Sequence, residues 1–311
     1  MKMLLSIVTP CFNEEHNVEE LYARICAAIA PLTSSYDFEI IAIDNASTDN
    51  TVNVLKGLAL KDNRLKIIVN NRNFGHIRSP YWGLMQASGV AAIYLASDLQ
   101  DPPEKIPQFI ERWEKGWKLV FAIKPVSETN PFVHRLRRLY YKLLDSISEV
   151  PIVKDSTGFG LYDRVVLNHL KQINDPYPYV RGLVSELGYP IATIDFTQPR
   201  RARGISKNNF YTLYDIAMLG IISHSVLPLR LAGMIGFGLA AGSFFASIFY
   251  FVYKLLNWNS FPVGMAPLVI LTTFFFGMLF LFLGIIGEYI GSIHLHLKNR
   301  PVVVEKERIN F

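Results

Sequence analysis

Short apolar runs rich in β-branched residues alternate with segments of helical spacing along the N-terminal part of the chain. The runs predict strands at 3–9, 38–44, 65–69, 91–97 and 118–123. Helices are predicted between them, from Asn13 as the cap to Ile29, from Ser47 or Asp49 to Ala59, from Tyr81 to Ala87 and from Pro103 to Lys115. This alternation predicts an α/β domain with a mostly parallel, doubly wound sheet.

The pattern becomes mainly helical between Lys124 and Arg203, with one late strand at 191–196. After it, residues 208–229 mix aromatic and apolar residues with sparse polar ones, which is typical of an amphipathic segment at a membrane interface. Two apolar runs without charge follow, at 231–253 and 261–287. About 20 apolar residues cross a bilayer, and buried core helices seldom run so long without a polar face.

These runs predict two transmembrane helices, at about 231–254 and 266–290. Their short connector carries one lysine, Lys254, whereas arginines and lysines gather outside the pair, so both ends are expected in the cytoplasm. We expect a multi-pass protein of the cell (inner) membrane. The expected parts are a cytoplasmic domain at 1–207, an interfacial segment at 208–229, the membrane pair at 230–291 and a cytoplasmic tail at 292–311.

Composition narrows the class of protein further. Half of the 311 residues are apolar and 13% are aromatic, which excludes a disordered chain. The net charge of +5 is modest, and the first 120 residues carry no basic stripe interleaved with aromatics, so no nucleic-acid partner is expected. Cys11 and Cys26 show neither metal-ligand spacing nor a disulfide framework.

Polar motifs follow three of the predicted strands: "PCFNEE", "DNASTDNT" and "SDLQD". In doubly wound sheets, ligands bind beyond the carboxyl ends of the strands. Asp44 could accept a hydrogen bond from a nucleobase or a ribose hydroxyl, or it could stabilise an ordinary turn before a helix. The same two interpretations stay open for Pro10, Asn13 and Glu14.

The motif "SDLQD" is more specific. Asp98 and Gln100 lie two apart on a chain that leaves the sheet, so both could face one side and hold Mg²⁺ or Mn²⁺ against a diphosphate. Asp101 is interpreted as a cap for the helix that opens at Pro102–Pro103. A P-loop enzyme is disfavoured, because the chain has no glycine-rich phosphate loop.

Basic residues cluster later in the chain. Arg135 and Arg138 are three apart and would share a helix face, while Arg137 is interpreted as solvated. Arg201, Ser206 and Lys207 offer donors for a lipid phosphate, or form an ordinary juxtamembrane positive cluster. No catalytic or metal-binding role is assigned to the histidines, among them His76, His224, His294 and His296.

Taken together and in order, the motifs "VTPCFNEEHN", "DNASTDNT", "NRNFG", "SDLQDPPE", "RARGISK", "LPLRLAG" and "GEYIG" carry a family resemblance over essentially the whole chain. The chain resembles the inverting GT-A glycosyltransferases of the dolichol-phosphate mannose synthase kind. Within them it is most similar to the bacterial GtrB-like branch, which charges a polyprenyl phosphate with a sugar.

The resemblance implies a GT-A fold and a single displacement in which a lipid phosphate attacks the sugar of a nucleotide diphosphate sugar. It implies that the lipid is of the undecaprenyl type, that the product serves modification of cell-envelope glycans, and it allows a homo-oligomer. The implied nucleotide-sugar contacts are Pro10, Phe12, Asn13, Glu14, Asp44, Ser97, Asp98, Gln100 and Lys124. The implied lipid-phosphate contacts are Arg135, Arg201, Ser206 and Lys207, with Asp98, Arg135 and Arg201 as catalytic residues and Asp98 and Gln100 as metal ligands.

The chain departs from the family pattern at two places. Ala96 stands where relatives commonly have the first carboxylate of Asp-x-Asp, so one metal or phosphate contact is missing. Gly158 and Gly160 replace an acidic and a basic residue of many relatives. Asp155 or Asp163 is the candidate to compensate for the lost side chains, and the replacement predicts an altered sugar preference.

Two alternatives stay open. A neutral hydroxyl acceptor, such as a diacylglycerol or a growing glycan, would need a general base, for which Asp155 or Asp101 is the candidate. The other alternative is a non-catalytic membrane scaffold that kept the fold.

Overall fold

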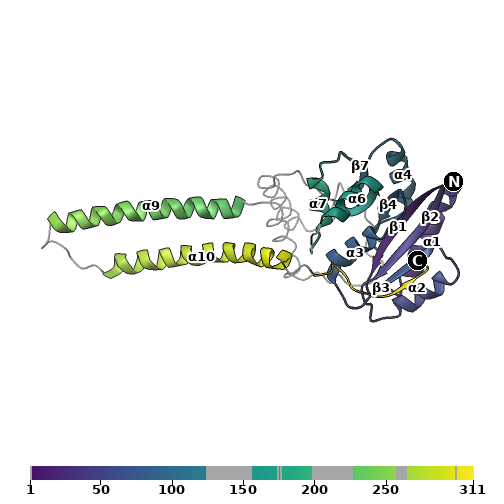
Figure 1. Cartoon of the computed structure of the whole chain (residues 1–311), viewed down its shortest axis with the longest axis horizontal. Helices are drawn as coiled ribbons and strands as arrows, with labels where there is room; N and C mark the ends of the chain where they lie inside the picture. Colours follow the sequence, from purple (N-terminus) through teal and green to yellow (C-terminus); the bar gives the residue numbers. More distant parts are fainter. Residues whose placement is uncertain are drawn as a thin grey trace. The chain divides into compact units, whose positions relative to one another are not determined.

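The computed structural model describes residues 2–123, 156–173, 175, 177–197, 227–256, 265–297 and 300–311. The chain divides into two compact units (Figure 1). The first comprises Met1–Ala217 together with Asn299–Phe311, and the second comprises Met218–Lys298.

Within the described residues, the first unit is built on an eight-stranded sheet with the order β7-β5-β6-β4-β1-β2-β3-β8. Its strands are β1 (Met3–Cys11), β2 (Tyr36–Asp44), β3 (Leu65–Asn70), β4 (Ala91–Tyr94), β5 (Leu119–Ile123), β6 (Ser156–Asp163), β7 (Ile191–Asp195) and β8 (Glu305–Ile309). Strands β1, β2, β3 and β4 are parallel, as are β5 and β7, whereas β6 and β8 run antiparallel to their neighbours. The predicted α/β fold with a mostly parallel sheet is therefore confirmed.

Helices cover both faces of this sheet. They are α1 (Val18–Ile29), α2 (Thr51–Ala59), α3 (Gly75–Met85), α4 (Ile106–Glu114), α6 (Arg164–Gln172) and α7 (Val180–Glu186), with short 3₁₀ turns at Ala30–Leu32 and Pro103–Lys105. One buried cluster joins α1, α2 and α4 to the sheet, and a second joins α3, α6 and α7 to the opposite face. Central strands are consequently apolar on both sides; in β1, Ile7 belongs to the first cluster and Val8 to the second.

Two helices begin at other residues than the sequence predicts. Helix α1 begins at Val18, and Asn13 is not its cap. Helix α3 begins at Gly75 rather than at Tyr81, because Pro80 is accommodated inside the helix. Proline has no N–H, so the carbonyl of His76 receives no helical hydrogen bond from it.

Strands β6 and β8 were missed by the sequence analysis. Strand β6 contains Gly158 and Gly160, and β8 reads Glu-Lys-Glu-Arg-Ile, so neither has the continuous apolar character of the central strands. Charged side chains are typical of strands at a sheet edge, where β8 lies.

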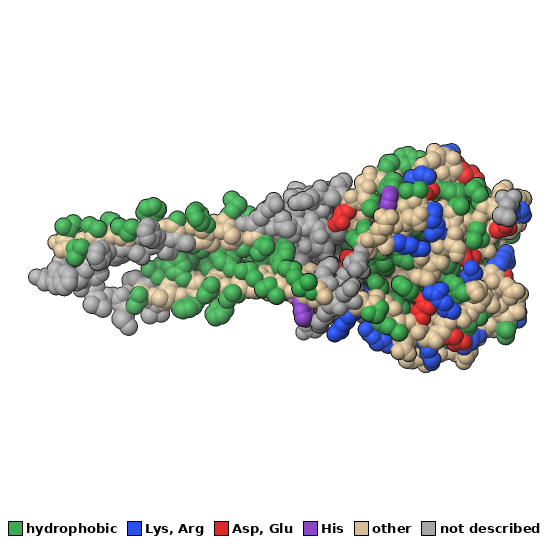
Figure 2. Space-filling model, in the orientation of Figure 1, with side chains coloured by type: hydrophobic (Ala, Val, Ile, Leu, Met, Phe, Trp, Pro, Cys, Tyr) green, Lys and Arg blue, Asp and Glu red, His purple; other side chains and the backbone are tan. Residues whose placement is uncertain are grey.

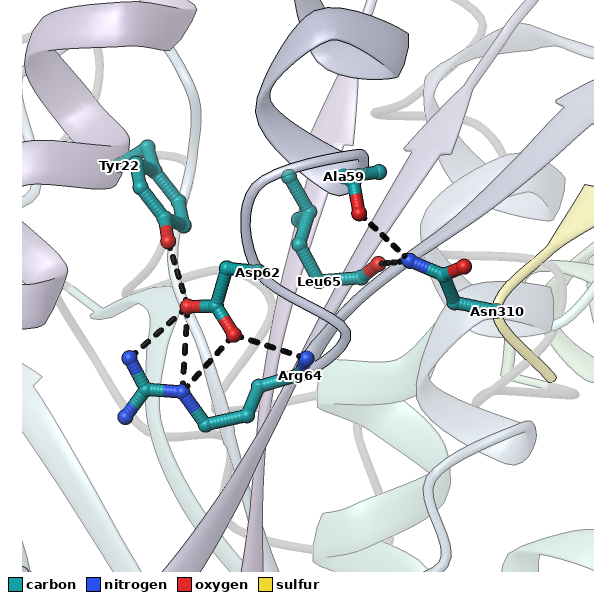
Figure 3. Close-up of polar contacts among 6 residues, drawn as sticks. All are labelled: Tyr22, Ala59, Asp62, Arg64, Leu65 and Asn310. Carbon is teal, nitrogen blue, oxygen red and sulfur yellow. Dashed lines mark hydrogen bonds and ion pairs between the residues drawn. The ribbon is translucent and has the colours of Figure 1, made fainter.

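Hydrogen bonds join the residue that follows the C-terminal strand β8 to the turn between α2 and β3 (Figure 3). The Asn310 side-chain amide donates to the carbonyls of Ala59 (3.1 Å) and Leu65 (2.9 Å). In the same turn, the Asp62 carboxylate accepts from the Tyr22 hydroxyl and from the Arg64 backbone and guanidinium. The hydrogen bonds from Arg64 lower the pKa of Asp62 to about 2.

The second unit contains two long helices, α9 (Leu227–Leu256) and α10 (Met265–Leu297), which run side by side. A Cβ atom built on Gly236 of α9 would lie 3.7 Å from the Phe282 ring of α10. Figure 2 shows apolar side chains over both helices, and Phe237 and Phe280 are among the exposed ones. Among the described residues, one segment, Phe274–His294, has the length and hydropathy that a membrane span requires.

Candidate active site

The carboxyl ends of β1, β2 and β4 meet at one edge of the sheet. Cys11 lies opposite Asp44, and Val8 lies opposite Tyr94. The three polar motifs of the sequence leave the sheet at this edge, as parallel strands require. The structure therefore brings together the candidate residues of all three motifs.

The loops after β1 and β2 are hydrogen-bonded to each other. The Asn13 backbone N–H donates to the Ser47 hydroxyl (2.8 Å), and the Asn13 side-chain oxygen accepts from the Thr48 backbone N–H (2.8 Å). The Glu14 N–H donates to the Thr51 hydroxyl (2.9 Å). Asn13 adopts a positive φ of 58°, a conformation that asparagine tolerates better than most residues. Asn13 thus fixes one loop against the other instead of capping α1.

Asp44 forms the turn that the sequence allowed for it. Its side chain is buried, and its carboxylate accepts from the backbone N–H (2.9 Å) and the hydroxyl of Ser47. Burial raises the pKa of Asp44, and the Ser47 hydrogen bonds oppose that shift.

Asn45 is an organising residue to which the sequence analysis gave no role. Its side-chain amide donates to Asn73 (2.9 Å), and its side-chain oxygen accepts from the Phe74 N–H (2.9 Å) and from Asn70 (3.2 Å). These bonds hold the loop that leads from β3 into α3. The clustering of asparagines in "DNASTDNT" and "NRNFG" was the available signal, because asparagine stabilises loops through side-chain to backbone bonds.

The loop after β4 alternates between buried and partly exposed residues. Ser97, Leu99 and Asp101 are buried, whereas Asp98 and Gln100 are partly exposed. The Asp98 carboxylate accepts from the Gln100 N–H (3.2 Å), and Leu99 takes a φ of 61°.

Two buried residues of this loop have internal partners. The Asp101 carboxylate accepts from the Ala96 N–H (3.0 Å) and closes the loop, and the 3₁₀ turn that follows has no side-chain cap. The expectation that Asp101 caps a helix is therefore wrong, and its buried, bonded carboxylate does not suit a general base. Ser97 hydrogen-bonds to Cys11, whose thiol pKa is raised by burial.

A cavity of about 110 Å³ opens beside this loop. Its lining includes Tyr94 of β4 and Tyr162 of β6, here called its floor, together with His76 of α3, Arg181 of α7 and Tyr179, which precedes α7. Burial raises the pKa of both floor tyrosines, so their hydroxyls stay protonated. Burial and the nearby charge of Arg181 lower the pKa of His76, which is therefore neutral at neutral pH.

Each of the two glycines of β6 is favoured at its position for a different structural reason. A Cβ atom on Gly160 would lie 2.3 Å from the Val120 carbonyl oxygen, so the close approach of β5 requires glycine there. Gly158 lines the cavity and has a φ of +91°. The backbone therefore accounts for both glycines, through the close strand contact at Gly160 and the positive φ at Gly158.

Asp163 does not compensate for Gly158 and Gly160. It pairs with Ala91 at the start of β4, whereas Gly160 pairs with Tyr94 at the end that carries the cavity. Its carboxylate caps α6 and accepts from Trp113 (2.7 Å) and Lys118 (3.1 Å). The expectation that Asp163 serves the sugar pocket is therefore wrong.

Several expected site residues lie outside the described residues: Lys124, Arg135, Asp155, Arg201, Ser206 and Lys207. The same holds for Arg137, Arg138 and His224. Among the residues that are described, no three His, Cys, Asp or Glu side chains gather in an arrangement that could hold a metal ion. A metal ion held by Asp98 and Gln100 would need its remaining ligands from a substrate.

Comparison with known families decides the assignment. The family model described as glycosyl transferase family 2 matches residues 6–171, which hold β1 to β6 and the three motif loops. The chain belongs to glycosyl transferase family 2. It is therefore a glycosyltransferase, and the GT-A fold expected from the motifs agrees with the observed sheet.

Relatives extend the similarity to nearly the whole chain. The chain is 33% identical to the SfII prophage-derived bactoprenol glucosyl transferase of Shigella flexneri, over 98% of each protein. It is 33% identical to the uncharacterized glycosyltransferase YkcC of Bacillus subtilis, over 96% of this chain and 92% of that protein. The expected resemblance to the GtrB-like branch is thereby confirmed.

Among solved structures, glucosyl-3-phosphoglycerate synthase from Mycobacterium tuberculosis, in complex with Mn²⁺, uridine diphosphate and glucosyl-3-phosphoglycerate, aligns with a TM-score of 0.48 and 17% identity. The alignment covers 71% of this chain and 78% of that one.

Proposed function

We propose that this glycosyltransferase moves a sugar from a nucleotide diphosphate sugar to a polyprenyl phosphate, with inversion at the anomeric carbon. The observation that carries the proposal is the similarity to bactoprenol glucosyl transferases over 98% of the chain, helices α9 and α10 included. The edge of the sheet supplies the matching chemistry, with Asp98 and Gln100 partly exposed beside a cavity. The product would serve cell-envelope glycan modification.

The donor would bind across the ends of β1, β2 and β4. Pro10, Phe12, Glu14 and Asp44 would contact the base and ribose. The bonds between the loops after β1 and β2 support this placement, because a preformed surface binds a ligand without first having to order it.

Asp98 and Gln100 fit a divalent cation of the Mg²⁺ or Mn²⁺ type. Both offer oxygen ligands, both are partly exposed, and such cations take their remaining ligands from substrate phosphates. When bound, the cation would neutralise negative charge on the departing diphosphate. Ala96 leaves this chain with one carboxylate fewer than the common family pattern, so we expect weak metal binding in the absence of donor.

The acceptor phosphate is anionic at neutral pH and needs no general base. The protein's task is to position two phosphates and to offset their charge. Lys124, Arg135, Arg201, Ser206 and Lys207 are proposed for that role on charge and motif alone. We also propose that α9 and α10 form a membrane hairpin in the cell (inner) membrane, with the catalytic unit and both termini in the cytoplasm.

A transfer assay tests the proposal. Purified full-length protein is incubated with undecaprenyl phosphate, a panel of nucleotide sugars and Mn²⁺ or Mg²⁺, with and without EDTA. The masses of the lipids are then measured by mass spectrometry. We expect one lipid whose mass has increased by a single sugar, and its loss on chelation. A sugar on a lipid hydroxyl, or no product with any donor, would refute the proposed acceptor.

A further inference from the structure

Charges of opposite sign lie near the cavity beside the Asp98 loop. Asp98 and Asp101 form an acidic side on the loop that follows β4, and Arg181, which lines the cavity, lies at the start of α7. The charges of Asp101, Arg181 and Asp98 all act on the hydroxyl of Tyr94, whose ring forms part of the floor. The acidic side, the aromatic floor and the arginine are therefore close neighbours.

The cavity is much larger than a site for ordered water. About 10–15 Å³ is enough for one water molecule, against about 110 Å³ here. Its lining combines aromatic rings with the neutral imidazole of His76 and one guanidinium. Rings of this kind present flat apolar faces with polar tips, which suits a group that bears both C–H faces and oxygens.

We propose that this cavity receives the phosphate end of the polyprenyl phosphate, and that Arg181 is a residue that positions this phosphate for attack. The inference rests on the proposed function. A single displacement needs the attacking and leaving groups on opposite sides of the sugar. The Asp98 loop would hold the leaving diphosphate, so the acceptor phosphate needs a separate cationic partner, and Arg181 in the lining of the cavity supplies one.

The chemistry of Arg181 agrees with this role. Guanidinium groups form paired, charge-assisted hydrogen bonds with phosphate oxygens. The Arg181 guanidinium carbon lies 5.3 Å from the centroid of the Tyr179 ring. This cation–π contact restricts the positions that the guanidinium can adopt. His76, neutral and on the same wall, can donate one further hydrogen bond.

A binding experiment tests the role directly. Farnesyl phosphate, a short soluble prenyl phosphate, is titrated into the detergent-solubilised full-length protein, with uridine diphosphate and farnesol titrated separately. Arg181→Gln should weaken farnesyl phosphate binding about 10- to 100-fold, the loss expected for a charged hydrogen-bonded partner, and Arg181→Lys should weaken it less. Farnesol and uridine diphosphate should bind as in the wild type.

Arg112→Gln is the matched control, because Arg112 is an exposed arginine in the last turn of α4. It should leave all three affinities unchanged. If Arg181→Gln bound farnesyl phosphate as the wild type does, the inference would be overturned. An equal loss of uridine diphosphate binding and of melting temperature would also overturn it, since that pattern belongs to a structural arginine.

Kinetics separate this inference from the proposed function. In the transfer assay, Arg181→Gln should raise KM for undecaprenyl phosphate about 10- to 100-fold and leave KM for the nucleotide sugar within about twofold. Methylguanidinium should partly restore Arg181→Ala. Normal transfer with an unchanged lipid KM would refute the role of Arg181 alone. Failure of the wild type to make any lipid-linked sugar, while farnesyl phosphate binding still depends on Arg181, would refute the proposed function alone.

Discussion

The two sides of the candidate active site are built in different ways. On the side of β1 and β2, loop side chains are committed to one another, as Asn13 is to Thr48 and Asn45 to Phe74. On the side of β4 and β6, Tyr94, Tyr162 and Arg181 line a cavity. The first side gains its shape from internal hydrogen bonds, and the second borders a space lined by aromatic rings and an arginine. Substitutions on the first side should therefore lower stability, whereas substitutions on the second should lower activity.

The largest expected effect belongs to Asp98. Asp98→Ala should reduce transfer about 10²- to 10⁴-fold, because the site would lose a ligand of the cation that offsets the charge of the diphosphate, while the melting temperature stays within about 2 °C of wild type. The measurement is the rate of lipid-linked sugar formation beside a thermal melt. Asp37→Asn, at an exposed carboxylate of β2, is the control and should be active. Wild-type turnover in Asp98→Ala would remove this residue from the mechanism.

Gly160 tests how closely β5 and β6 approach, a backbone feature separate from the side chains that line the cavity. Gly160→Ala would bring a methyl group to 2.3 Å from the Val120 carbonyl, so we expect a loss of about 3 kcal/mol or more, seen as poor folding or a strongly lowered melting temperature. Gly57→Ala on α2 meets no atom within 4 Å and should instead stabilise by about 0.5–1 kcal/mol. Equal melting temperatures for the two variants would contradict the close strand approach.

Asn45 tests the opposite side. Asn45→Ala removes its hydrogen bonds to Asn73, Asn70 and Phe74, and should cost roughly 2–3 kcal/mol in unfolding free energy, or about 5–10 °C in melting temperature. Asn53→Ala, at an exposed asparagine of α2, should change it by less than about 2 °C. If the Asn45 variant melted normally but bound nucleotide poorly, Asn45 would be a ligand contact and not a loop organiser.

The smallest effect concerns pH and lies away from the site, at Asp62. Its pKa is lowered to about 2 from 3.8, so its ion pair with Arg64 stabilises the fold fully above about pH 4, and the contribution disappears as the pH falls from 4 to 2. The contribution is at most about 2 kcal/mol. Asp62→Asn should lower stability at pH 7 and flatten its dependence on pH between 4 and 2, which denaturant titrations at several pH values would measure. An unchanged slope would show that Asp62 is not held in this way.

Much of the fold could be predicted because it depends on local patterns. Six strands, β1 to β5 and β7, follow from short apolar runs rich in β-branched residues. Strand β8 could not be predicted in the same way, because its charged residues join the sheet only through pairing with a distant strand, β3. Residue Asp163 was misplaced for a related reason, since the antiparallel direction of β6 carries it to the far end of β4.

The candidate site, too, could be predicted from the sequence only in part. The motifs after β1, β2 and β4 were visible because each follows its strand directly. Arg181 and His76 were not, because a single cation in "YVRGL" and a single histidine after a glycine look like ordinary surface residues. Only the packing of α3 and α7 over β4 and β6 brings them to one cavity.

The proposed reaction is a single displacement at a sugar held between the Asp98 loop and Arg181. Its stereochemistry can be tested through the anomeric configuration of the lipid-linked product made from an α-linked nucleotide sugar, read from the proton coupling constant by NMR. We expect a β-linked sugar phosphate. An α-linked product would require two displacements or a different attack geometry, and would contradict the single displacement.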